Sequence, residues 1–207
     1  MSRNRELAVV TGAASGIGRA TTQLLVDKGC RVLAVDKDSQ GLKALEAQTG
    51  ANTLCVDLGD PSDRSRVIAA GEGANYLVNA AGVILLKPIG SVTVEDWRKI
   101  QTVNAEAIFF LCQGLGPTIP AGGAIVNLSS SSAKLASTVE AAVYAASKTT
   151  ILSITRSFAY SLSNVPVRVN AVCPAIIDTP MQDAVLDKVS SQRGLTSEEL
   201  RTSRNAS

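Results

Sequence analysis

Leu7-Ala-Val-Val-Thr-Gly-Ala-Ala-Ser-Gly-Ile-Gly18 is the stretch of sequence that decides the fold. Its first five residues predict a buried strand, and a helical pattern follows the last glycine. Glycines at such a junction let the backbone turn tightly and approach a pyrophosphate, to which the helix N-terminus offers free N–H groups. The spacing GxxxGxG differs from the common GxGxxG pattern, and many strand–helix turns contain two glycines, so the turn alone is a weak signal. The candidate binding residues of the turn are Gly12, Ser15, Gly16, Ile17 and Gly18.

Working outward, apolar strands and helical stretches alternate along the whole chain. This alternation predicts βαβ crossovers and a parallel sheet covered on both faces. We expect an α/β fold, a Rossmann-type doubly wound parallel sheet in three α/β/α layers, with residues 1–207 as a single domain. The expected strands are Glu6–Thr11, Cys30–Asp36, Asn52–Asp57, Asn75–Asn79, Ala124–Ser129 and Val167–Cys173. The expected helices are Gly16–Lys28, Ser39–Gln48, Ser62–Ala70, Val94–Leu115, Glu140–Leu162, Ala184–Val189 and Thr196–Arg201, the last with Thr196 and Glu199 as a capping box.

Composition excludes several classes of function. The chain is 45% hydrophobic with a formal net charge of +2, which is typical of a globular domain and gives no nucleic-acid footprint. It has no histidine, which excludes a histidine base or metal ligand. The four cysteines are widely spaced, so we expect no metal site and interpret them as buried core residues in a reducing, cytoplasmic compartment. The apolar run Leu7–Val10 is too short to span a membrane.

Asp36 sharpens the prediction for the glycine-rich turn. It ends the run Val32-Leu-Ala-Val-Asp36, eighteen residues after Gly18. A carboxylate there can accept hydrogen bonds from both adenosine ribose hydroxyls and would repel a 2′-phosphate. Ser15 offers no cation to such a phosphate, although Lys37 weakens the discrimination. We therefore expect NAD(H) as cofactor; the alternative is an ordinary acidic turn residue.

Two later strands end in the same kind of position. Asp57 and Leu58 follow the third strand, and Asn79-Ala80-Ala81-Gly82 follows the fourth. Open α/β sheets bind their ligands at the carboxyl ends of the strands. We therefore expect Asp57, Leu58, Asn79, Ala80 and Gly82 to line the cofactor crevice.

Tyr144-Ala-Ala-Ser-Lys148 places a phenol and an ammonium four residues apart. On a helix this spacing puts both groups on one face. A nearby cation stabilises a phenolate, so we expect the pKa of the tyrosine to fall towards a range useful for proton transfer. Taken alone, the pair is also compatible with an incidental surface contact.

In combination, these motifs resemble the short-chain dehydrogenase/reductase family. Thr11-Gly-Ala-Ala-Ser-Gly-Ile-Gly18, Asn79-Ala-Ala-Gly82, Asn104, the run Ser129–Ser132 and the Tyr144/Lys148 pair occur in the order of that family, over essentially the whole chain. The resemblance implies that Tyr144 is the general acid and base and that Lys148 binds the nicotinamide ribose. Asn104 would hold a water in a proton relay, and Val103 would line the cofactor groove.

The resemblance leaves the substrate-binding serine open. The usual spacing to the tyrosine, thirteen residues, selects Ser131, whereas alignment on the strand end Val126-Asn-Leu-Ser-Ser130 selects Ser130. We favour Ser131, because the loop must return the serine to the tyrosine. Ser129 and Ser132 are expected to satisfy local backbone groups. After the sixth strand, Pro174, Ile177 and Thr179 match the segment that contacts the nicotinamide carboxamide in this family.

The chain departs from the family pattern at its C-terminus. Residues 175–207 correspond to the substrate lid, and the final strand that family members add is absent from the sequence. The resemblance also implies a homodimer or homotetramer that pairs the helices Val94–Leu115 and Glu140–Leu162, whose apolar residues exceed what one sheet face needs.

The leading functional hypothesis is an NAD-dependent oxidoreductase that transfers a hydride between the cofactor and a secondary alcohol or ketone. The second is a non-catalytic dinucleotide-binding or regulatory protein, and the third is an epimerase or dehydratase of the same family. Retention of Asn104, Tyr144 and Lys148 together with a serine favours the first. The lid sequence does not identify the substrate.

Overall fold

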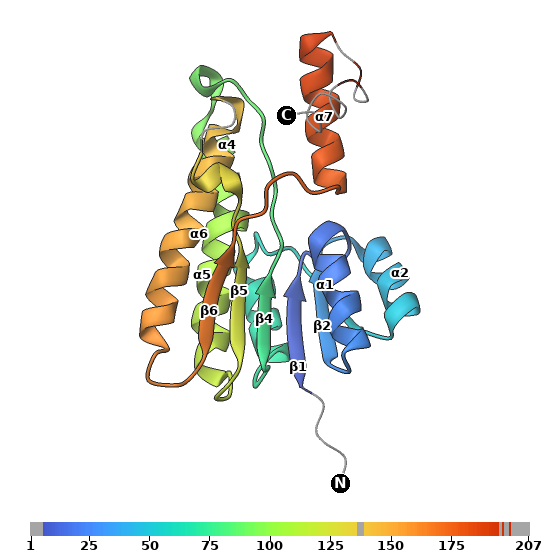
Figure 1. Ribbon diagram of the computed structural model, residues 1–207, viewed down its shortest axis with the longest axis vertical. Coiled ribbons are helices and arrows are strands. Elements are labelled where there is room, and N and C mark those ends of the chain that lie inside the picture. The colour runs from blue at the N-terminus through green and yellow to red at the C-terminus, as the bar shows by residue number, and fades with distance from the viewer. Residues whose placement is uncertain (1–5, 136–138, 195, 197–198, 200–207) are drawn as a thin grey trace. The chain divides into compact units, whose positions relative to one another are not determined.

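The computed structural model describes residues 6–135, 139–194, 196 and 199 of the chain. Two compact units are present, Met1–Ala175 and Ile176–Ser207. The first unit contains one six-stranded sheet in the order β3-β2-β1-β4-β5-β6, with β1 in the middle (Figure 1). The strands are β1 Leu7–Thr11, β2 Arg31–Asp36, β3 Asn52–Cys55, β4 Tyr76–Asn79, β5 Ala124–Leu128 and β6 Arg168–Val172, and every neighbouring pair is parallel.

Helices connect the strands, as the sequence predicts. They are α1 Gly16–Asp27, α2 Ser39–Thr49, α3 Pro61–Ala70, α4 Val94–Gln101, α5 Ala107–Leu115 and α6 Ala142–Ser161 in the first unit, and α7 Pro180–Arg193 in the second. The α/β architecture with a doubly wound parallel sheet is confirmed, and the expected strand ends agree with the observed ones to within two residues. Thr196 and Glu199 form the expected capping box, since the Glu199 N–H donates to Thr196 Oγ1 at 3.2 Å and the Thr196 N–H donates to Glu199 Oε2 at 2.7 Å.

The core has two parts, on opposite faces of the sheet. Successive residues of a strand point to opposite faces. Val9 accordingly packs in a large cluster with residues of α3, α5 and α6, whereas Ala8 and Val10 pack in a smaller cluster with Leu42 and Leu45 of α2. Aliphatic side chains thus cover both faces, as expected for a doubly wound sheet with few aromatic residues.

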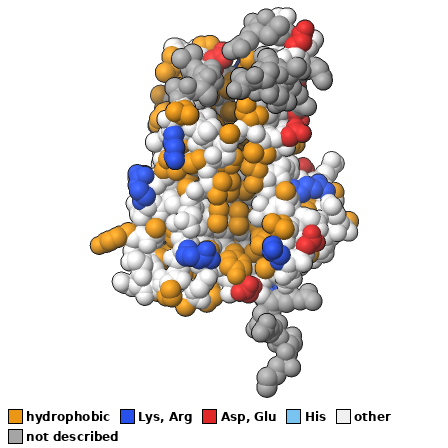
Figure 2. All heavy atoms as spheres, in the orientation of Figure 1, with side chains coloured by type: hydrophobic (Ala, Val, Ile, Leu, Met, Phe, Trp, Pro, Cys, Tyr) orange, Lys and Arg blue, Asp and Glu red, His pale blue; other side chains and the backbone are white. Residues whose placement is uncertain are grey.

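Figure 2 shows hydrophobic side chains gathered down the middle of one face of the molecule, with further ones at its edges. Lys and Arg side chains are scattered singly over this face. Among the described residues seen there, basic side chains form no continuous stripe.

The expected helix Val94–Leu115 is helical throughout, but a π turn at Thr102–Glu106 separates α4 from α5. There the Ala107 N–H reaches back five residues to the Thr102 carbonyl, which adds one residue to the turn. The expectation that all four cysteines are buried is wrong: Cys112 lies in the core, but Cys55 is exposed because it ends the edge strand β3.

Candidate active site

β1 and β4 lie side by side at the switch point of the sheet, because the chain leaves β1 for a helix on one side and β4 for a helix on the other. Open α/β sheets bind their ligands at such a point, so the expected crevice would begin here. Gly12 has a φ of 68° here, and a Cβ on it would lie 2.7 Å from the Ala81 nitrogen. The Ala81 N–H also donates to Thr11 Oγ1 at 3.2 Å. The two turns therefore pack backbone against backbone, which only glycine permits at position 12.

The N-terminus of α1 is suited to an anion. Ser15 is the N-cap residue, yet its side chain makes no capping hydrogen bond. By contrast, a side chain caps each of four other helices: Asp38 caps α2, Asp60 caps α3, Thr93 caps α4 and Thr179 caps α7. A Cβ on Gly18 would lie 2.1 Å from the Gly12 carbonyl oxygen, so the first turn of α1 presses directly on the loop. The first-turn N–H groups are thus left for a phosphate group, and these residues fit the pyrophosphate of a dinucleotide.

Asp36 ties the glycine-rich turn to the end of β2. Its Oδ2 accepts a hydrogen bond from the Ala14 N–H at 3.0 Å, and its Oδ1 accepts one from the Asp38 N–H at 3.0 Å. Each carboxylate oxygen has a second lone pair, so both remain able to accept a ribose hydroxyl. The carboxylate therefore lies beside the turn, where the sequence predicts it.

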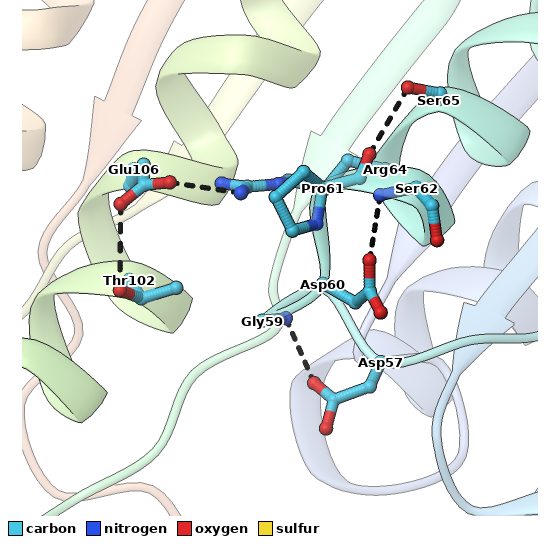
Figure 3. Close-up of polar contacts among 9 residues, drawn as sticks. All are labelled: Asp57, Gly59, Asp60, Pro61, Ser62, Arg64, Ser65, Thr102 and Glu106. Atoms are coloured by element: carbon cyan, nitrogen blue, oxygen red, sulfur yellow. Dashed lines mark hydrogen bonds and ion pairs between the residues drawn. The ribbon is translucent and has the colours of Figure 1, made fainter.

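The loop after β3 presents Asp57 but not the side chain of Leu58. Asp57 Oδ1 accepts a hydrogen bond from the Gly59 N–H at 2.9 Å (Figure 3). A Cβ on Gly59 would lie 3.8 Å from Val103 Cγ2, so this loop and the π turn are neighbours. Leu58 is 7% exposed and packs in the core. Its side chain therefore cannot line the crevice as expected, because it is used in packing; only its backbone remains available.

The end of β5 holds the helix that carries the Tyr144/Lys148 pair. Lys148 Nζ donates to the Leu128 carbonyl at 2.8 Å, and Ser129 Oγ donates to the Lys148 carbonyl at 2.7 Å. The next residue, Ser130, hydrogen-bonds the side chain of Tyr144. Three consecutive residues thus fix α6 against the sheet, and Ser129 satisfies a local backbone group as predicted.

Ser130, not Ser131, meets the tyrosine. Ser130 Oγ also accepts the Ser132 N–H at 3.1 Å. Ser131 starts a 3₁₀ turn, Ser131–Ala133, and is held through its backbone, since its N–H donates to the Pro174 carbonyl at 2.9 Å. Ser130, the serine that alignment on the strand end selects, is therefore the one beside Tyr144, rather than the favoured Ser131. The loop before Tyr144 has one residue more than the usual spacing.

The pKa values in the pair correct another expectation. Burial raises the pKa of Tyr144 above its ordinary value, and the hydrogen bond with Ser130 offsets part of that rise. Burial also lowers the pKa of Lys148 to about 8. The ammonium lies 5.7 Å from the centre of the tyrosine ring. The expected fall in the pKa of Tyr144 is wrong in this structure, because burial outweighs the hydrogen bond with Ser130.

Asn104 is fully buried beside this pair. Its Oδ1 accepts the Val83 N–H at 2.8 Å, and its Nδ2 donates to the Val83 carbonyl at 2.9 Å and to Ser147 Oγ at 3.0 Å. A Cβ on Gly82 would lie 3.3 Å from Lys148 Nζ and 3.5 Å from Asn104 Oδ1. Gly82, Asn104 and Lys148 therefore converge, as the sequence predicts.

Sequence reasoning missed Ser147 as a link in this site. Ser147 is fully buried, donates to the Tyr144 carbonyl at 2.7 Å and accepts from Asn104. The only signal for it is its place one residue before Lys148. A serine between two predicted functional residues on a helix has no distinguishing pattern, so its role becomes visible only with the neighbouring helix in place.

A chain of buried polar side chains runs beneath the site. Asn79 Nδ2 donates to Asn127 Oδ1 at 2.8 Å, and Asn127 Nδ2 donates to Thr155 Oγ1 at 3.0 Å. The three residues come from β4, β5 and α6. The Asn79 side chain is therefore directed into the core, and only the backbone of Asn79 and Ala80 borders the crevice turn.

The last candidate residues lie in or next to the second unit. Pro174 belongs to the first unit and accepts the Ser131 N–H. Thr179 is the N-cap of α7, where its Oγ1 accepts the Gln182 N–H and donates to the Ile177 carbonyl, each at 3.3 Å. Among the described residues, no group of three or more Cys, Asp or Glu side chains forms a metal site, and no helix is long and apolar enough to cross a membrane.

Comparison with known proteins agrees with this geometry. A family model described as enoyl-(acyl carrier protein) reductase matches residues 12–203. D-threitol dehydrogenase of Mycolicibacterium smegmatis is 34% identical over 187 residues, covering 85% of this chain and 72% of that protein.

Two solved structures are also similar. A short-chain dehydrogenase/reductase, glucose/ribitol dehydrogenase, from Brucella melitensis has a TM-score of 0.83 at 32% identity, covering 90% of this chain and 78% of its own. An actinorhodin polyketide ketoreductase with NADPH has a TM-score of 0.87 at 28% identity, covering 97% and 82%. The chain belongs to the short-chain dehydrogenase/reductase family.

Proposed function

We propose that this dehydrogenase/reductase interconverts a secondary alcohol and a ketone with NAD(H), and that Tyr144 transfers the proton. The observation that carries the proposal is the convergence of Tyr144, Ser130, Lys148 and Asn104 at the carboxyl ends of β4 and β5. When bound, NAD(H) supplies or accepts the hydride.

The proton chemistry follows from the environment of Tyr144. A raised pKa keeps the phenol protonated at neutral pH, so it can donate a proton to a carbonyl oxygen during reduction. Ser130, which already contacts the phenol, would hydrogen-bond the same oxygen. In the oxidation direction Tyr144 must first lose its proton, so oxidation is expected to accelerate as the pH rises.

The cofactor would be held by the residues that surround the crevice. The first turn of α1 suits the pyrophosphate, Asp36 the adenosine ribose, and Lys148, which keeps donors beyond its bond to Leu128, the nicotinamide ribose. The candidate set in the first unit is Gly12, Ser15, Gly16, Ile17, Gly18, Asp36, Asp57, Asn79, Ala80, Gly82, Val103, Tyr144, Lys148 and Pro174, with the backbone of Leu58. Ile177 and Thr179 stay predictions from the sequence.

A panel of alcohols and ketones followed by NADH absorbance tests this function. The names of two similar proteins, a threitol and a glucose/ribitol dehydrogenase, make small polyols and their ketones the first substrates to try. Hydroxysteroids, hydroxyacyl compounds and cyclic diols complete the panel. NADH binding without hydride transfer to any of them would favour a non-catalytic dinucleotide-binding protein instead.

Asp36 is expected to make NADH bind more tightly than NADPH. Like charges about 4 Å apart near a protein surface repel by about 1–4 kcal/mol, which corresponds to a preference of about fivefold or more. Asp36→Asn removes the charge and keeps an acceptor for the Ala14 N–H, although its amide nitrogen cannot accept the Asp38 N–H; it should narrow the preference for NADH over NADPH. Asp36→Ala should narrow the preference for NADH too. It should also weaken the binding of NADH, because the glycine-rich turn loses two hydrogen bonds. Fluorescence titration measures both cofactors; equal affinities in the wild type would contradict the role of Asp36.

We also propose a homo-oligomer that uses α5 and α6. Phe109 and Phe110 are 39% and 40% exposed, and their rings pack edge to face with centroids 5.5 Å apart. By contrast, the core buries Ile108, Ile151 and Ile154. These three are therefore not among the apolar residues that exceed what one sheet face needs. An exposed pair of aromatic rings on one helix is typical of an interface. A monomeric mass in light scattering at micromolar concentration would rule the proposal out.

A further inference from the structure

Arg64 on α3 is a charged side chain in an unusual environment. The side chain is only 4% exposed, and long basic side chains are rarely buried unless they are paired. One guanidinium nitrogen, Nη2, donates to Glu106 Oε1 at 2.9 Å. The guanidinium also lies 5.3 Å from the centre of the Phe110 ring. Arg64 thus joins α3 to the segment between α4 and α5, and nothing in the proposed chemistry uses it.

Glu106 is the last residue of the π turn Thr102–Glu106. Thr102 Oγ1 lies 3.5 Å from Glu106 Oε2, at the limit of a hydrogen bond (Figure 3). π turns are rare, insert one extra residue into a helix and often occur at functional sites. Asn104 lies within this turn and reaches Val83 and Ser147 from it. The carboxylate that meets Arg64 therefore ends the same turn that presents Asn104.

The other side of the contact adjoins the loop Asp57–Asp60, which contains the candidate residue Asp57. α3 begins at Pro61, immediately after the loop Asp57–Asp60, and the Arg64 N–H donates to the Asp60 carbonyl at 3.1 Å. Asp60 caps the helix through a hydrogen bond from the Ser62 N–H at 2.7 Å. Arg64 thus lies in the first turn of α3, the helix that directly follows the loop presenting Asp57 (Figure 3).

We propose that Arg64 is a positioning residue: its ion pair with Glu106 holds the π turn so that Asn104 keeps its contacts with Val83 and Ser147. The same contact links the loop Asp57–Asp60 to the centre around Asn104. The inference rests on the proposed function only where it describes that centre as catalytic. Its structural part, the dependence of the Asn104 contacts on Arg64, can be tested without turnover.

Hydrogen exchange at the Val83 amide is the direct test, because this N–H donates to Asn104 Oδ1. Arg64→Met keeps the apolar stem and removes the guanidinium. We expect it to speed exchange at Val83 and within 102–107 by about tenfold, the effect of losing one charge-assisted hydrogen bond. Arg64→Lys should restore part of the protection. Arg66→Met is the matched control, since Arg66 lies on the same helix and pairs with Asp63 at 2.7 Å but is 56% exposed.

Activity supplies a second readout. If Tyr144 catalysis is correct, Arg64→Met should lower kcat more than it weakens NADH binding, and Arg66→Met should change neither. Unchanged exchange at Val83 in Arg64→Met overturns the positioning role, whatever the activity. Should that variant fail to fold, Glu106→Gln removes the charge from the half-exposed partner and must speed Val83 exchange for the inference to stand. A wild-type protein without activity, but with the exchange pattern above, would refute the proposed function and leave this inference intact.

Discussion

Replacing Tyr144 with phenylalanine is expected to lower kcat by about 10²–10⁴-fold, the range that general acid–base assistance contributes. The ring and its packing survive the change, and only the hydroxyl is lost. NADH affinity should therefore stay close to that of the wild type. Steady-state turnover on a substrate found in the alcohol and ketone panel, with NADH titration beside it, measures both quantities.

Two neighbouring serines provide matched controls for the loss of a hydroxyl. Ser130→Ala removes the group that hydrogen-bonds Tyr144, so turnover should fall strongly. Ser131→Ala removes a hydroxyl from a residue held through its backbone, so turnover should change little. Near-normal turnover of Tyr144→Phe would show that the proton passes through another group. Equal effects of the two serine variants on turnover would show that the contact between Ser130 and Tyr144 does not contribute to catalysis.

Lys148→Met is expected to remove most activity and weaken NADH binding, yet to make the free protein more stable. Burial lowers the pKa of Lys148 from 10.5 to about 8, which corresponds to about 3 kcal/mol of folding free energy lost to the buried charge at neutral pH. The variant avoids this cost, but it leaves the Leu128 carbonyl without its donor, and that loss lowers the stability by about 1 kcal/mol or more. The free energy of unfolding, measured without cofactor, should therefore rise by about 1–2 kcal/mol.

The pH dependence gives this prediction a sign that can be checked. Below pH 8 the amine is charged in both the folded and the unfolded state, and the folded state carries the whole burial cost. Between about pH 8 and 10.5 the folded protein releases the proton first, so the wild type gains stability relative to the variant. The advantage of Lys148→Met should thus be greatest below pH 8 and decline across this window. An advantage that grows with pH would contradict a buried, charged Lys148.

The sequence predicts most of the fold because the relevant signals are local. β1 and β2 are continuous apolar runs ending at Thr11 and Asp36, and glycine residues mark the turn before α1. The π turn could not be predicted in this way. Val94–Leu115 shows a helical pattern on both sides of Asn104, and that pattern does not mark where an extra residue enters a turn.

The candidate site was predictable in its members but not in all its contacts. Tyr144, Lys148 and Asn104 stand out because they match a family pattern, and the structure brings the three together. Ser130 competes with Ser131 by spacing alone, and spacing fails because the loop before Tyr144 has one residue more. Arg64 and Glu106 are 42 residues apart and match no motif, so their pairing emerges only when α3 packs against α5.

The polar chain from Asn79 through Asn127 to Thr155 has a consequence for how this protein tolerates change. Each residue supplies a hydrogen-bond partner that another needs inside the protein, so replacing one alone leaves a buried donor or acceptor unpaired at a cost of about 1–3 kcal/mol. Replacing neighbouring members together by apolar residues of similar shape can be nearly neutral. A protein engineer who redesigns the strands β4 and β5 must therefore treat the three positions as one unit. Evolution by single substitutions would pass through a less stable intermediate, which a simultaneous change of neighbouring positions avoids.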